Sequence, residues 1–237
     1  MPILCVLFGL VAASAASAAG PPEAARVVRL LEARYSGVKT LRAVFLERYL
    51  ENGRQVRAES GKVSFWRPGK MRWEYEVPET KLFVSDGHAI WFYVPADRTA
   101  LRSSARESSD WRTPFLLLTK KPRVSRLCQQ VTLGSAEEAL IPGNRVLHCQ
   151  PRGAKAAAAL PRRADAARVL SRHAEEELLL EVDPATGDLS RVLIRQGGGV
   201  GLEFRFSNWE RNPHLADSQF VFHPPPGVAI VEGQPTD

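Results

Sequence analysis

Residue types that could support catalysis or metal binding are widely separated in this 237-residue chain. The five histidines, His88, His148, His173, His214 and His223, do not form a metal-ligand spacing such as H-E-x-x-H. No combination of nucleophile, general base and oxyanion donors can be assembled around them. We therefore expect no metal site, no cofactor and no enzymatic activity, and among the functional classes considered a hydrolase is the least favoured.

Three short motifs resemble known sites only in part. Residues 36–39 match S-x-x-K, but the partner motifs of penicillin-recognising enzymes are missing. Residues 183–188 lack the alternating carboxylates of a calcium loop. The glycines at 197–199 follow a strand pattern, yet G-x-G-x-x-G is broken at Leu202 and no helix pattern follows. We interpret all three segments as turns.

The N-terminal residues indicate an exported protein, in which a disulfide is expected. Residues 3–13 form an apolar run, shorter than the roughly 20 residues that span a membrane, and Ala16-Ser17-Ala18 suits signal peptidase. We expect a signal peptide over residues 1–19, cleaved near Ala18-Ala19 together with Cys5. Cys128 and Cys149 then form a disulfide that ties two strands outside any cavity and stabilises by roughly 3 kcal/mol, or they remain two buried thiols.

Composition favours a folded globular protein, with 44% hydrophobic and 24% charged residues. The net charge of +6 is spread along the chain, so we expect no nucleic-acid partner. Residues 20–237 are predicted to form a single domain. An Ala/Arg-rich stretch at about 153–172 is interpreted as an insert.

The clearest strand signals lie between residues 61 and 95. Met71, Trp73 and Tyr75 alternate with Arg72 and Glu74, which is the period of a half-buried strand. The first three side chains are therefore expected to face something apolar.

A hairpin is predicted immediately after this strand. Asp86-Gly87 suits a two-residue type I′ turn, which places Phe83 opposite Ile90 and Lys81 opposite Phe92. Phe83, Ile90 and Phe92 then share one face. The other face carries Leu82, Val84, Trp91 and Tyr93. Because neither face is polar, we expect this part of the sheet to be covered on both sides.

The rest of the chain predicts one long helix and further strands. The spacing of apolar residues predicts a helix from Glu23 to about Ser36. Strands are predicted over 41–50 and 57–66, joined at Asn52-Gly53, and over 98–102, 124–133, 144–150, 176–182, 189–196 and 200–209. The fold class is therefore mainly β with helices (α+β), an open antiparallel barrel of about 10–11 strands capped by helices.

A short apolar segment and one arginine are candidates for a binding device. Residues 114–119, PFLLLT, predict a short helix that is too small to form its own core and should cover the apolar face of the sheet. Arg67, next to Pro68-Gly69, has five planar donors that could bond loop or helix carbonyls. The alternative is a solvated arginine in an ordinary turn.

Three segments together resemble the LolA family of periplasmic outer-membrane lipoprotein carriers. They are WRPGKMRWEYEVPETKLFVSDGHAIWFYVP, TPFLLL and FVFHPPPGV, in the order and spacing of that family. The resemblance implies an unclosed β-barrel with a helical lid over an apolar cavity that receives acyl chains. It also implies a monomer that accepts lipoproteins from an inner-membrane ABC transporter and delivers them to an outer-membrane receptor or directly to the outer membrane.

The resemblance assigns expected roles to named residues. Arg67 falls on the arginine that holds the lid, and Met71 stands where an aromatic residue is more usual, which a flexible pocket tolerates. Taken with the strand pattern, the expected cavity comprises Met71, Trp73, Tyr75, Phe83, Ile90 and Phe92. The expected lid comprises Pro114, Phe115, Leu116, Leu117 and Leu118.

Two alternatives remain open at this point. A protein of the same fold could carry another amphiphile, such as a glycolipid or lipid, and lipid extraction would distinguish it. A sensing or binding module of this fold would lack an open cavity and would not bind a hydrophobic dye.

Overall fold

The computed structural model describes residues 22–104, 118, 123–152 and 177–233. The predicted signal peptide at 1–19, the lid residues Pro114, Phe115, Leu116 and Leu117, and the insert at 153–172 lie outside the described residues.

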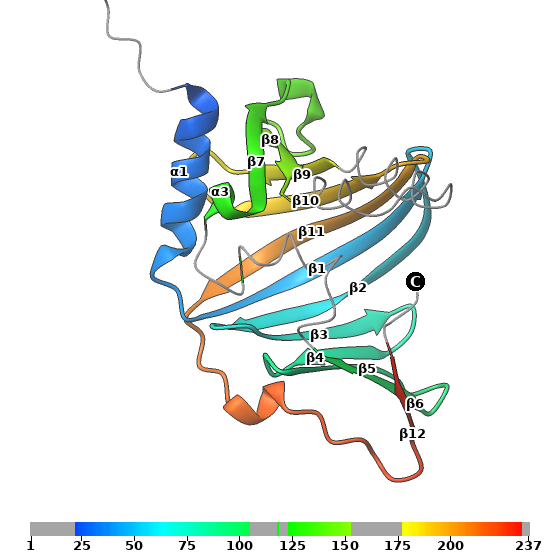
Figure 1. The fold of residues 1–237 in the computed structure, drawn as a ribbon. Helices are drawn as coiled ribbons and strands as arrows, with labels where there is room; N and C mark the ends of the chain where they lie inside the picture. The colour runs from blue at the N-terminus through cyan, green and yellow to red at the C-terminus, as the bar shows by residue number, and fades with distance from the viewer. Residues whose placement is uncertain (1–21, 105–117, 119–122, 153–176, 234–237) are drawn as a thin grey trace, which may run out of the picture.

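A single curved sheet of 12 strands dominates the described structure (Figure 1). The strands are β1 (Thr40–Glu51), β2 (Arg54–Trp66), β3 (Lys70–Val77), β4 (Lys81–Ser85), β5 (Ala89–Val94), β6 (Thr99–Ser104), β7 (Cys128–Leu133), β8 (Arg145–Pro151), β9 (Glu177–Val182), β10 (Leu189–Gln196), β11 (Val200–Arg211) and β12 (Ala229–Glu232). Their order is β12-β6-β5-β4-β3-β2-β1-β11-β10-β9-β8-β7.

The sheet is open, because its edge strands β7 and β12 are not paired with each other. The predicted fold class, an unclosed, mainly antiparallel β structure with helices, is confirmed. The strand β12 was not expected from the sequence. It pairs in parallel with β6, while the other neighbouring strands are antiparallel.

Two turns with similar sequences behave differently. Asn52-Gly53 forms the predicted tight turn, with φ of 49° and 77°, and Glu51 pairs with Arg54 across it. The two-residue turn predicted at Asp86-Gly87 is wrong, because Phe83 pairs with Phe92, and Ser85 pairs with Ile90.

The Asp86 side chain explains the longer connection at 86–89. Its Oδ1 accepts hydrogen bonds from the backbone N–H groups of His88 and Ala89, each at 2.7 Å. This local turn competes with the tighter type I′ turn. The register moves by two residues, so Phe83, Ile90 and Phe92 still share one face as predicted.

One long helix and several short helical turns border the sheet, and one of these turns occupies the start of a predicted strand. The long helix α1 spans Glu23–Ser36, as the apolar spacing predicted. Residues Val124–Leu127 form the helical turn α3, so the strand predicted over 124–133 begins only at Cys128. The 3-10 turns η2 (Ala136–Glu138) and η4 (Asp217–Phe220) complete the described helical structure.

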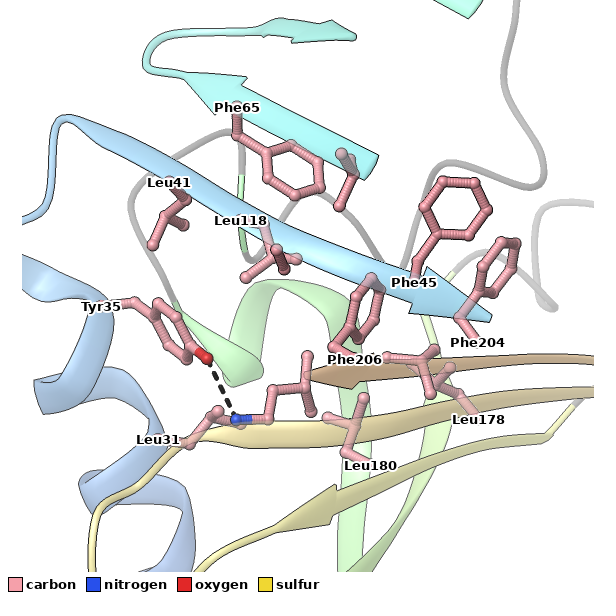
Figure 2. Close-up of a cluster of buried hydrophobic side chains, with 14 of the residues drawn as sticks. Leu31, Tyr35, Leu41, Phe45, Phe65, Leu118, Leu178, Leu180, Phe204 and Phe206 are labelled. Carbon is pink, nitrogen blue, oxygen red and sulfur yellow. Dashed lines mark hydrogen bonds between the residues drawn. The ribbon is translucent and has the colours of Figure 1, made fainter. Parts of the chain in front are cut away.

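The main core lies between α1 and one face of the sheet, which we call the inner face. Figure 2 shows Leu31 and Tyr35 of α1 lying toward Leu180 of β9, with Phe45 and Phe206 further along the same face. Alternation along each strand produces this face, since every second residue points to it.

The opposite, outer face of β3–β6 is covered by the C-terminal segment (Figure 1). The Phe220 ring lies 5.8 Å from the Trp66 ring, and the Phe222 ring lies 5.4 Å from Trp91 and 5.3 Å from Tyr93. The expectation that this hairpin is covered on both sides is therefore confirmed.

Candidate functional site

The six residues expected to line a cavity share the inner face of β3, β4 and β5. Strand pairing sets Trp73 opposite Phe83, and Phe83 opposite Phe92. Met71, Trp73, Tyr75, Phe83 and Ile90 are buried in the main core, and Phe92 is partly buried against it. Tertiary packing thus brings all six together on one surface.

The centre of this surface is Trp73, whose side chain is fully buried. Its ring contacts Phe45 at 4.8 Å, Phe65 at 5.9 Å, Phe204 at 5.5 Å and Phe206 at 6.2 Å between centroids. We call these five residues the aromatic cluster. Most of its contacts are edge-to-face, the geometry that aromatic rings favour.

The sequence-based site missed the four phenylalanines of the aromatic cluster. Phe204 and Phe206 alternate with charged residues in β11, whereas Phe45 and Phe65 each have at least one apolar neighbour in β1 and β2. The period-2 pattern that identified Met71 and Trp73 was therefore present in β11 but not around Phe45 and Phe65. The meaning of the pattern depended on which strands become neighbours, and Phe206 of β11 pairs with Phe45 of β1 from 161 positions away.

Arg67 lies at one end of this surface, between three backbone carbonyls. Its guanidinium donates to the carbonyl of Leu118 at 2.9 Å and to that of Val38 at 3.0 Å, and it also bonds the carbonyl of Tyr35. Burial lowers the pKa of Arg67, but the pKa starts so high that the group remains charged. Arg67 thus joins the end of α1 to the segment around Leu118.

Leu118 is the one residue of the predicted lid that the structure describes. Its side chain is fully buried and belongs to the main core. In Figure 2 it lies between Leu41, Phe65 and Tyr35, pointing onto the inner face. Its backbone oxygen meets Arg67, so its position depends on both burial and one charged donor.

α1 is attached to the sheet by several polar contacts. Arg34 donates twice to the carboxylate of Asp188, at 2.5 and 2.6 Å. The backbone N–H of Leu189 donates to the Tyr35 hydroxyl at 3.0 Å (Figure 2), and burial raises the pKa of that hydroxyl. Arg145 bonds Glu23 at 2.7 Å near the start of the helix.

The predicted disulfide between Cys128 and Cys149 is confirmed, and it joins the paired strands β7 and β8 with 5.4 Å between Cα atoms. Its expected place outside the cavity stays a prediction. Both cysteines belong to the main core, and Cys149 shares the inner face with Leu147. The reason is strand alternation, which turns residues 147 and 149 to the same side.

A polar row borders the aromatic cluster on the inner face. It consists of Glu47, Glu59, Tyr75 and Lys81, one residue from each of β1 to β4. The Tyr75 hydroxyl donates to Glu47 Oε2 at 2.7 Å, and Lys81 Nζ donates to Glu59 Oε1 at 2.6 Å. Tyr75, which was expected to line the apolar cavity, therefore supplies a polar hydroxyl as well.

Two further observations limit the kinds of site present. Among residues 22–104, 118, 123–152 and 177–233, no three His, Cys, Asp or Glu side chains are grouped to hold a metal ion. In the same described ranges, no helix has the length and apolar character needed to cross a membrane.

The open twelve-stranded sheet with a helix on its inner face defines a class of fold that occurs in other proteins. A solved structure of an uncharacterised conserved protein from Thermus thermophilus matches with a TM-score of 0.52 and 14% identity, covering 90% of this chain and 100% of that one. At this identity the match shows the fold alone.

Sequence comparison identifies the family. The model described as outer membrane lipoprotein carrier protein LolA matches residues 36–155. An outer-membrane lipoprotein carrier protein from Chromobacterium violaceum is 29% identical over 226 residues, covering 94% of this chain and 96% of that protein. Another from Dechloromonas aromatica is 30% identical over 195 residues, covering 81% of each. The chain belongs to the LolA family.

Proposed function

We propose that this protein is a periplasmic carrier that binds the acyl chains of lipoproteins on the inner face of its sheet. The observation that carries the proposal is the position of Arg67, which joins Leu118 and the end of α1 above the aromatic cluster. The relatives named outer-membrane lipoprotein carrier proteins support the class of cargo.

Binding energy for such cargo comes from apolar burial. Each buried CH₂ group contributes about 0.8 kcal/mol, so one partly enclosed acyl chain is enough to hold a lipoprotein. Met71, Trp73, Tyr75, Phe83, Ile90 and Phe92 provide the surface, together with the phenylalanines of the aromatic cluster. An acyl chain enters by taking the place of Leu118 against this surface.

Release requires a state in which the apolar surface is covered again. The lid, Pro114 to Leu118, closes over the inner face when cargo leaves, and Arg67 stabilises that closed state through the carbonyl of Leu118. A hydrogen bond from a charged donor contributes about 1.5–3 kcal/mol, which is comparable to a few CH₂ groups. Arg67 therefore balances loading against release.

The partners follow from this cycle. The carrier acts as a monomer, receives lipoproteins from an inner-membrane ABC transporter, and delivers them to an outer-membrane receptor or to the outer membrane itself. Export by the signal peptide at residues 1–19 places it in the periplasm.

Replacing Arg67 tests the release step. We expect Arg67→Leu to accept lipoprotein normally but to deliver it poorly, because the closed state loses its charged bonds and the loaded state gains apolar surface. Transfer from preloaded carrier to outer membranes measures this. Arg72→Leu on the outer face is the matched control, and normal delivery by Arg67→Leu would reduce Arg67 to an ordinary turn residue.

Replacing Met71 tests the binding surface. Met71→Glu is expected to abolish cargo binding with little change in fold, because a carboxylate on the apolar surface must be desolvated or must bring in water. Arg72→Glu, one residue along on the outer face, should bind normally. Cargo recovered from the periplasm is measured by acyl-chain mass spectrometry, and unchanged recovery with Met71→Glu would contradict the proposed surface. Recovery of glycolipids instead of lipoproteins would favour a carrier of another amphiphile.

A further inference from the structure

The polar row divides the inner face into an apolar part and a polar margin. Glu47 pairs across the strands with Glu59, and Tyr75 pairs with Lys81. The Tyr75 ring also lies 5.0 Å from Phe45 of the aromatic cluster. One side chain thus contacts the apolar cluster with its ring and the Glu47 carboxylate with its hydroxyl.

Glu47 differs from Glu59 in its charge partners. Glu59 makes ion pairs with Lys81 at 2.6 Å and with Arg57 at 3.9 Å. Within the part of the chain that the structure describes, Glu47 makes no ion pair and accepts its hydrogen bond from the neutral Tyr75 hydroxyl. A half-buried carboxylate beside aromatic rings is costly without a cation, so it calls for an explanation.

Tyr75 is the donor of the pair, and Glu47 needs further donors to stay ionised. Burial raises the pKa of the Glu47 carboxyl, which disfavours its ionised form, and burial next to Glu47 raises the pKa of Tyr75 well above 10. Tyr75 therefore stays protonated and donates. An ionised carboxylate offers about four acceptor positions, and Tyr75 occupies one of them, so Glu47 can accept further hydrogen bonds from a ligand.

We propose that Glu47 and Tyr75 form a polar subsite that binds an N–H group at the root of the cargo's acyl chains. The inference rests on the proposed function, since it requires acyl chains on the adjacent aromatic cluster. An amphiphile placed with its tail on Phe45 and Trp73 presents its first polar atoms to Glu47. The subsite takes an ammonium or an amide N–H, which share the donor chemistry that a carboxylate requires.

The same geometry disfavours anionic amphiphiles. Glu47 and Glu59 both face the margin, and the Lys81 ammonium is already bonded to Glu59. A sulfate or carboxylate head would meet two carboxylates while the ammonium of the row is already engaged. The polar row therefore selects by head group, whereas the aromatic cluster selects only by apolar area.

Single-chain probes of equal tail length test the subsite on the purified full-length carrier. Decylammonium, N-decylacetamide, N-decyl-N-methylacetamide and decyl sulfate are compared by displacement of an apolar fluorescent dye. We expect decylammonium to bind about tenfold more tightly than decyl sulfate, because a charge-assisted hydrogen bond replaces repulsion. A preference for N-decylacetamide over its N-methyl analogue would identify the amide as a ligand as well.

Glu47→Gln removes the charge of the subsite and is expected to preserve the fold, since the glutamine oxygen still accepts the hydrogen bond from Tyr75. We expect the variant to lose the preference for decylammonium and to keep its affinity for N-decyl-N-methylacetamide. Glu76→Gln, on the outer face of the same sheet and paired with Lys62, should leave the preference unchanged. If Glu47→Gln misfolds, Tyr75→Phe provides the second variant, with a weaker preference expected.

The outcomes distinguish this inference from the proposed function. If all four probes bind equally, or if Glu47→Gln keeps the preference, the subsite is refuted while the apolar surface stands. If no probe displaces the dye from any variant, the apolar binding surface itself is refuted.

Discussion

α1 and Leu118 both pack on the inner face, but the described contacts that hold them differ. α1 is fixed by the doubly bonded Arg34–Asp188 pair, by the Tyr35 hydroxyl and by the Glu23–Arg145 bond. Leu118 is attached by its buried side chain and by the Arg67 bond to its carbonyl. Among the described residues, α1 is therefore held by several polar contacts in addition to its packing, and Leu118 by its packing and one charged donor.

The attachments of α1 also have a geometric consequence. The turn at Asp183–Asp188 approaches the helix so closely that a Cβ on Gly187 would lie 2.7 Å from the carbonyl oxygen of Leu30. Gly187 has φ of 78°, so both the backbone conformation and the close contact require glycine. This docking leaves little freedom for α1 to move relative to the turn.

The largest expected effect comes from truncating one leucine in each segment. Leu31→Ala in α1 should lower the free energy of unfolding by about 2–5 kcal/mol, the usual range for a buried leucine. Leu118→Ala should lower it by less than about 1 kcal/mol if Leu118 belongs to the proposed lid, because a lid that opens locally contributes little to the stability of the sheet. Urea denaturation followed by tryptophan fluorescence measures both, and equal losses would show that the two segments belong to one permanent core.

A smaller effect is expected from the ion pair that holds α1. Arg34→Met should cost about 1.5–3 kcal/mol, since both charged hydrogen bonds to Asp188 are lost and both side chains are mostly buried. Arg26→Met, whose contact with Glu23 is exposed at 3.8 Å, is the control and should change stability by less than about 0.5 kcal/mol. A comparable loss in the two variants would mean that the Asp188 pair does not fix the helix.

The smallest expected effect is a pH dependence confined to the half of the sheet that carries α1. His148 on β8 contacts Glu177 at 2.5 Å and Glu138 at 2.7 Å through its two ring nitrogens. Burial by itself lowers the pKa of His148, but the hydrogen bonds and charges of Glu177 and Glu138 outweigh it and raise the pKa above 6.5. These contacts require the protonated ring, in which both nitrogens donate.

A raised histidine pKa stabilises the folded state at low pH. The contribution is fully present below about pH 6.5 and is lost as the pH rises through the pKa of the folded state. Because the carboxylates are partly exposed, we expect a loss on the order of 0.5 kcal/mol. His148→Gln should remove this slope in urea denaturation between pH 6 and 8.5, and exposed His214→Gln should retain it. If the free energy of unfolding still depends on pH in His148→Gln, a group other than His148 causes the dependence.

Local pattern predicted a large part of this structure. The apolar spacing of residues 24–31 set the face of α1, and the Met71–Tyr75 alternation set the inner face of β3. Asn52-Gly53 fixed a turn because both residues accept positive φ. Asp86-Gly87 carried the same signal but gave a longer connection, because its carboxylate bonded two neighbouring N–H groups.

The candidate site could be predicted as a set of residue types but not as a set of contacts. Sequence alone determined that Arg67 is a charged donor beside apolar strands, since residue chemistry and short-range spacing are properties of the chain. Its partners are 29, 32 and 51 positions away, and only the tertiary packing of α1 and Leu118 on the sheet brings their carbonyls within reach. The Glu47–Tyr75 bond arose in the same way, across strands whose neighbours depend on the topology of the whole sheet.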